Sequence, residues 1–200
     1  MKAALVLASC AACALGGHRP NYQYYVISSQ APPSASVRSD RIAPALTVTV
    51  KIPGYLDREQ IATRTGPHVT YSTTDRWAEP LDQAFERTLR EDLAAQLRQR
   101  GIQVAAHAAN ASYELAVDVM RFERSAADRV ELWARWTLRV GTNVVDGGVT
   151  RMQVATRATD SASAAAALSD AIAGMARDVA GRVQQADVVA TRPSKNRPAK

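Results

Sequence analysis

Two segments with apolar residues at alternate positions, 113–122 and 130–140, constrain the fold of this chain more than any other feature. Such alternation is typical of neighbouring strands that bury one face. A hairpin loop centred on Ala126 and Ala127 sets a single register, in which apolar residues face each other inside and opposite charges meet outside. The expected neighbours are Val117 with Trp136, Leu115 with Leu138, Asp118 with Arg135 and Glu114 with Arg139.

Two amphipathic helices are expected beside these strands. The first lies between Pro80, which suits a first helical turn, and Gly101, which suits the position after the last turn. The second follows Asp160-Ser161, a typical N-cap sequence. Each helix carries one apolar stripe and therefore one face to bury. The stripe residues are Leu81, Phe85, Leu89, Leu93 and Leu97 in the first helix, and Leu168, Ile172, Met175, Val179 and Val183 in the second.

Shorter apolar runs predict further strands, over residues 22–27, 46–52, 68–73, 102–106 and 149–156. For the last of these, Asp146-Gly147-Gly148 is expected to form the connection, with a glycine bulge that turns Met152 and Val154 inward. The expected fold is therefore α+β, with an antiparallel or mixed β-sheet and both amphipathic helices packed on one face.

The N-terminal residues resemble a bacterial lipoprotein signal. A short basic start and an apolar run lead to Leu7-Ala8-Ser9-Cys10, in which small residues precede a cysteine able to carry a lipid. Cys13 is an alternative attachment point. A plain cleaved signal peptide and a redox or zinc site at Cys10-x-x-Cys13 are the other interpretations. The expected organisation is a signal peptide at 1–9, a lipidated N-terminus and tether at 10–21, one α+β domain at 22–187 and a basic disordered tail at 188–200.

The charge and the polar residues indicate neither a nucleic-acid-binding protein nor an enzyme. The net charge of +6 comes largely from the two ends, which leaves too little for a binding stripe. His18, His68 and His107 lack further ligands at metal spacing, and no serine lies in a Gly-x-Ser-x-Gly elbow. We expect no catalytic residue and no metal, and no cofactor other than a covalent N-terminal lipid.

Three residues are candidate contacts for a protein partner. Trp133 lies on the otherwise polar face of its strand, where either a helix or loop covers it or it forms an exposed aromatic anchor. Tyr55 and Leu56 follow a strand and either contact a partner or fold back as a cap on the sheet. By contrast, Trp77 before the first helix is expected to be a structural plug.

Two motifs resemble a known family. Pro53-x-Tyr-Leu-Asp-Arg-x-Gln-Ile61 and the later Trp77-Ala-Glu-Pro-Leu-Asp82, followed by a helix with Arg87-x-Leu89, resemble the PqiC family. Its members are auxiliary lipoproteins of ABC-type and MCE-type lipid transport systems in Gram-negative envelopes.

The resemblance implies a periplasmic lipoprotein that docks the end of an MCE-domain conduit protein, with a homo-oligomer as one possibility. Ala11 after the cysteine is not the aspartate that favours inner-membrane retention, so the resemblance implies an anchor in the outer membrane. The alternative is a periplasmic carrier that holds an acyl chain in a pocket under the helices.

Overall fold

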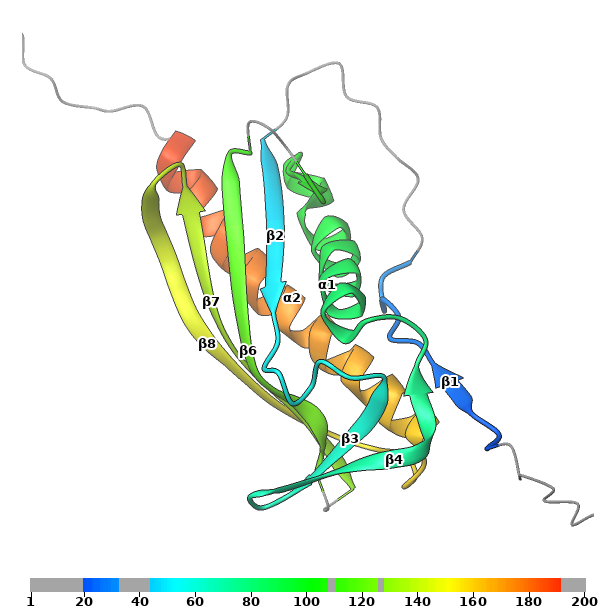
Figure 1. The fold of residues 1–200 in the computed structure, drawn as a ribbon. Coiled ribbons are helices and arrows are strands. Elements are labelled where there is room, and N and C mark those ends of the chain that lie inside the picture. The colour runs from blue at the N-terminus through cyan, green and yellow to red at the C-terminus, as the bar shows by residue number, and fades with distance from the viewer. Residues whose placement is uncertain (1–19, 33–43, 108–110, 126–127, 192–200) are drawn as a thin grey trace, which may run out of the picture.

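Strand β6 (Tyr113–Ser125) is the centre of a mixed eight-stranded sheet. The structure, a computed structural model, describes residues 20–32, 44–107, 111–125 and 128–191 (Figure 1). The predicted signal peptide, both cysteines, His18, the Ala126–Ala127 loop and most of the basic tail lie outside these residues. The other strands are β1 (Gln23–Tyr25), β2 (Ala45–Lys51), β3 (Gln60–Thr65), β4 (His68–Trp77), β5 (Gln103–Ala105), β7 (Arg129–Val140) and β8 (Asn143–Ala155).

The strand order is β1-β4-β3-β6-β2-β5, and β7 and β8 extend the sheet from the other edge of β6. The first half of β6 pairs with β2 and its end pairs with β3, both in parallel. The neighbours β7 and β8 are antiparallel. The sheet is therefore mixed, as predicted.

The predicted register of the central hairpin is confirmed. Val117 pairs with Trp136, Leu115 with Leu138, Asp118 with Arg135 and Glu114 with Arg139. The charged pairs are opposite each other, but neither is among the ion pairs that the described residues form. The register thus places opposite charges across from each other without a direct ion pair between them.

The prediction for the start of β8 was wrong. Gly147 and Gly148 lie inside the strand, opposite Thr137 and Trp136, and the turn comes earlier, at Gly141 with φ of 56°. A bulge does occur, but at Val145, where the register shifts. It restores the inward direction that was predicted for Met152, which pairs with Leu132. The glycines are needed for packing, because a Cβ at position 148 would lie 2.9 Å from the Trp136 ring.

Both helices lie on one face of the sheet, as predicted (Figure 1). Helix α1 (Leu81–Leu97) continues into the short 3-10 helix η1 (Arg98–Arg100) and ends at Gly101, whose φ is 71°. Helix α2 (Ser161–Thr191) is capped by Asp160, whose Oδ1 accepts a 2.6 Å hydrogen bond from the Ser163 N–H. This bond also lowers the pKa of the Asp160 carboxyl.

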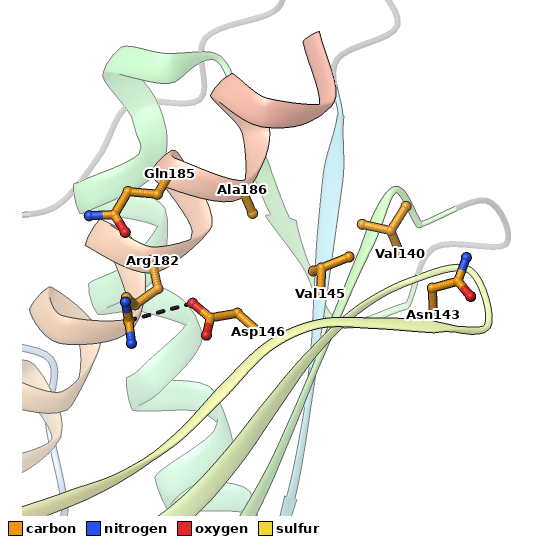
Figure 2. A pocket seen from close by; sticks show the side chains of 7 residues that line it. All are labelled: Val140, Asn143, Val145, Asp146, Arg182, Gln185 and Ala186. Atoms are coloured by element: carbon orange, nitrogen blue, oxygen red, sulfur yellow. Dashed lines mark ion pairs between the residues drawn. The ribbon is translucent and has the colours of Figure 1, made fainter. Parts of the chain in front are cut away.

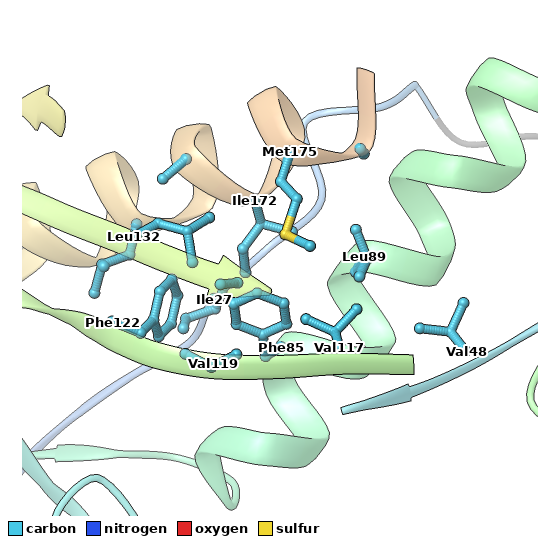
Figure 3. Close-up of a cluster of buried hydrophobic side chains, with 14 of the residues drawn as sticks. Ile27, Val48, Phe85, Leu89, Val117, Val119, Phe122, Leu132, Ile172 and Met175 are labelled. Atoms are coloured by element: carbon cyan, nitrogen blue, oxygen red, sulfur yellow. The ribbon is translucent and has the colours of Figure 1, made fainter. Parts of the chain in front are cut away.

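Large side chains fill the space between the helices and the sheet (Figure 3). Phe85 of α1 meets Phe122 of β6 edge to face, with ring centroids 4.9 Å apart. Ile172 and Met175 of α2 are fully buried. Strand β3 was not predicted, because its sequence lacks apolar alternation; its Ile61 and Ala62 are both buried.

Candidate docking surfaces

Helix α2 connects two exposed apolar surfaces at opposite ends of the domain. At its start, the Ser161 hydroxyl donates a 2.6 Å hydrogen bond to Asp75 of β4, the residue that pairs with Gln23 of β1. Near its end, Arg182 forms an ion pair with Asp146 of β8 at 3.5 Å. A rise of about 1.5 Å per residue separates Ser161 from Arg182 by roughly 30 Å. Figure 1 shows β1 and the β7–β8 turn at these two ends.

The first surface, here called the β8 tip, consists of Val140, Val144 and Val145 around the β7–β8 turn. Val144 is 60% exposed and Val145 45% exposed. A groove of about 510 Å³ lies between this turn and the end of α2 (Figure 2). Its lining is Val140, Asn143, Val145, Asp146, Arg182, Gln185 and Ala186. An apolar floor with polar groups at its margin is typical of a protein-docking surface.

The conformation of the tip follows from local sequence. Gly141 supplies the positive φ of the turn, and the bulge at Val145 leaves two successive valines without a place in the core. Beyond the bulge, Trp136 of β7 packs against Gly148 of β8, and this contact holds the two strands together. The valines are therefore held outside by a well-packed strand pair.

The second surface, here called the β1 edge, consists of Tyr22, Tyr24 and Val26. Their exposed fractions are 44%, 62% and 52%. Tyr25, between Tyr24 and Val26, packs against the core, and Ile27, which follows Val26, is fully buried. The sequence signal for this surface was an extended segment with apolar residues on both faces, although it was interpreted only as a strand.

Trp133 is half-buried, and among the described residues two arginines lie over its ring. It lies on the sheet face opposite the helices and is flanked in register by Arg121 of β6 and Arg151 of β8. Their guanidinium carbons lie 5.5 Å and 4.2 Å from the ring centroid, typical of cation–π contacts. Arg121 also pairs with Glu131 at 2.9 Å. The indole Nε1 is buried and has no hydrogen-bond partner among the described residues.

Leu56 belongs to the core and is only 2% exposed, so its side chain offers almost no surface to a partner. The adjacent Tyr55 folds back on the sheet: its hydroxyl donates to the Glu123 carboxylate, 2.9 Å away, and lies 3.2 Å from the Met120 carbonyl oxygen. Burial is the main reason that the pKa of Tyr55 is raised to about 12. The structure thus shows the cap that was one of the two interpretations of this segment.

Glu123 is a buried carboxylate that sequence reasoning missed. It accepts hydrogen bonds from the Tyr55 hydroxyl, from the Phe122 N–H at 2.8 Å and from Arg64 Nε at 2.5 Å. The Arg64 guanidinium also lies over the Tyr55 ring at 4.9 Å. These contacts satisfy the buried charge and account for a structural network.

The part of the chain that the structure describes contains no cluster of three metal-ligating side chains. His68 and His107 are both exposed and belong to no such cluster. Among the described helices, none is sufficiently long and apolar to cross a membrane. Trp77 is buried, as expected of a plug between β4 and α1.

Comparison with family models decides the relationship of the chain. Residues 25–180 match the model of the ABC-type transport auxiliary lipoprotein component. The chain belongs to this family. Membership confirms the resemblance indicated by the motifs at Pro53–Ile61 and Trp77–Asp82, and it identifies the chain as a transport auxiliary lipoprotein.

Solved structures support the fold of this auxiliary lipoprotein. An uncharacterized protein is 20% identical with a TM-score of 0.69, and the match covers 82% of this chain and 99% of the other. Protein XCC0632 from Xanthomonas campestris is also 20% identical, with a TM-score of 0.68 and coverage of 86% and 100%. No curated protein shows significant similarity to the chain.

Proposed function

We propose that this auxiliary lipoprotein is anchored by a lipid on Cys10 to the periplasmic face of the outer membrane and docks the end of an MCE-domain protein at the β8 tip. The single observation that carries the docking site is the pair of exposed valines, Val144 and Val145, beside a groove. The role is non-enzymatic: acyl chains hold the domain at the bilayer, and the tip positions the partner.

The distance between the two exposed surfaces supports this arrangement. The chain enters the domain at the β1 edge, only a short tether after Cys10. The β8 tip lies roughly 30 Å further along α2. Because the β8 tip is far from the anchored end of the domain, it is available to a protein that extends across the periplasm.

The filled core argues against the alternative of a lipid carrier with its pocket under the helices. The side chains that face each other across this space are fully or almost fully buried (Figure 3). They include Ile27, Phe85, Leu89, Phe122, Leu132, Ile172 and Met175. An acyl chain between the described helices and the sheet would have to displace them, at several kcal/mol.

Lipidation is tested by intact-mass analysis and membrane fractionation of the wild type beside Cys10→Ser and Cys13→Ser. We expect acyl chains and outer-membrane fractionation in the wild type, and the loss of both only in Cys10→Ser. Loss only in Cys13→Ser would move the anchor to Cys13. An unmodified wild type that is found in the soluble fraction would overturn the anchor.

Docking is tested by photo-cross-linking in cells that express the MCE-domain protein of the same transport system. A photoreactive residue replaces Val144 at the tip, Arg135 beside Trp133, or Asp170 on the exposed side of α2. We expect a cross-link to the MCE-domain protein from position 144 and none from position 170. A cross-link from position 135 alone would move docking to the Trp133 face. No cross-link from any position in an anchored protein would refute the docking role.

A further inference from the structure

The β1 edge presents two tyrosines and a valine on one side of a strand. Tyr24 is the most exposed of them, and all three belong to the exposed large apolar residues of the domain. Tyrosine has an apolar ring and a polar hydroxyl, which suit it to the boundary between lipid and water.

The edge is held rigidly. Strand β1 pairs in parallel with β4, its only neighbour among the described strands. The Arg76 guanidinium stacks on the Tyr22 ring at 4.7 Å and is itself fixed by the carbonyl oxygens of Ser72, Thr73 and Asp75. The exposed side chains therefore keep a defined direction relative to the sheet.

The chain after β1 is fastened to both helices. The Ser28 N–H donates to the Ser169 hydroxyl of α2 at 3.1 Å. On α1, the buried Asp92 accepts bonds from the Ser29 hydroxyl at 2.5 Å and from the N–H groups of Gln30 and Ala31. These bonds fix the position of the β1 edge relative to both helices.

The edge also lies close to the proposed anchor in the chain. Twelve residues after Cys10 the chain reaches Tyr22, and a fully extended segment of that length spans at most roughly 40 Å. The β1 edge, the first exposed apolar surface among the described residues, is thus within reach of the bilayer, whereas the β8 tip lies roughly 30 Å beyond it along α2.

We infer that Tyr22, Tyr24 and Val26 form a bilayer-contact edge that inserts into the headgroup region of a phospholipid membrane and orients the domain with the β8 tip away from it. The inference rests on the proposed function, because a lipid anchor brings the edge to the membrane. Contact at three side chains is too small for stable binding without that anchor.

The experiment replaces the native anchor, so that it does not depend on acylation. A domain that begins at Cys10, with Cys10→Ser and Cys13→Ser and an N-terminal histidine tag, is held on phosphatidylethanolamine–phosphatidylglycerol vesicles by a nickel-chelating lipid. A nitroxide label is placed at Tyr24→Cys or, as the matched control, at Val144→Cys. Its accessibility to water-soluble chromium oxalate is measured by electron paramagnetic resonance with and without vesicles.

We expect vesicles to reduce the accessibility of the label at position 24 by roughly threefold or more and to leave position 144 unchanged. In the Tyr22→Ser, Val26→Ser background this protection should be lost while the melting temperature stays the same.

Equal accessibility at both positions on vesicles would overturn the inference, even if intact mass confirms lipidation of Cys10. Protection at position 24 without vesicles, together with a larger particle in solution, would instead assign the edge to a second copy of the chain and overturn membrane contact. If the label at position 24 is protected on vesicles and intact-mass analysis finds the wild type unmodified, the bilayer-contact edge is supported and the native lipid anchor is refuted.

Discussion

The β1 edge and the β8 tip are both exposed and apolar, yet they differ in side chains and in support. The edge carries tyrosines at a three-residue strand, and the chain that follows this strand is fastened by hydrogen bonds to both helices. The tip carries aliphatic valines on a long hairpin that is secured by packing of Trp136 on Gly148. Amphipathic tyrosines suit an interface with lipid, and valines beside a groove suit a dry protein contact.

The difference in support also predicts a difference in response to mutation. The edge depends on a few directed polar bonds in the chain that follows it, three of which end on the buried carboxylate of Asp92. The tip depends on close packing, and the Arg182–Asp146 ion pair beside it has an arginine that is half exposed. Polar substitutions should therefore damage the edge most, and changes in volume should damage the tip most.

The largest effect is expected from Asp92→Ala at the edge. The substitution leaves the Gln30 N–H and the Ser29 hydroxyl without their acceptor, and the Ala31 N–H keeps only the Ser29 oxygen. The free energy of unfolding should therefore fall by about 3 kcal/mol. Chemical denaturation measures the loss, and hydrogen exchange should increase at both amides. Glu91→Ala, one residue away and half exposed, is the control and should change stability little. Equal effects of the two substitutions would contradict the role of Asp92.

At the tip, Gly148→Leu should lower the free energy of unfolding by about 1–3 kcal/mol, because the new side chain collides with the Trp136 ring. Hydrogen exchange should increase in β8 and remain unchanged in β1. The control is Gly181→Ala on α2, where a Cβ meets open space and helix propensity should raise stability by about 0.5–1 kcal/mol. Tolerance of leucine at position 148 would show that packing does not secure the tip.

The pH dependence of stability should show a contribution from Tyr55. Its pKa in the folded protein, about 12, is above the ordinary value of 10.0. The stability contributed by its neutral form is complete below pH 10 and is lost as the pH rises toward 12. Between pH 9 and pH 11.5, the free energy of unfolding measured by denaturation should therefore fall less in Tyr55→Phe than in the wild type. An identical decline in both proteins would show that another group is responsible.

The smallest effect is expected from Arg182→Ala at the tip. The ion pair with Asp146 is long and its arginine is half exposed, so its loss should cost less than about 1 kcal/mol. The effect should shrink further as salt is added. A loss as large as that of Gly148→Leu would show that electrostatics, rather than packing, holds α2 to the tip.

The sequence by itself determined the main elements and the central register. Apolar alternation in β6 and β7 sets which face is inward, and the loop centred on Ala126 and Ala127 then selects the pairing in which Val117 meets Trp136. The apolar stripes of α1 and α2 likewise required a common sheet to cover. The two motifs indicated the family, because they combine rare residues in a fixed order.

Only the tertiary structure decided which apolar residues remain outside. Whether Tyr24 or Leu56 is exposed depends on neighbours far away in the chain: the core covers only the face of β1 that carries Tyr25, and Leu56 enters a core built from other strands and helices. The place of Gly148 depends in the same way on Trp136 across the hairpin. Local patterns state which side chains favour burial, but the surfaces that meet a partner or a membrane are those left after every other element has packed.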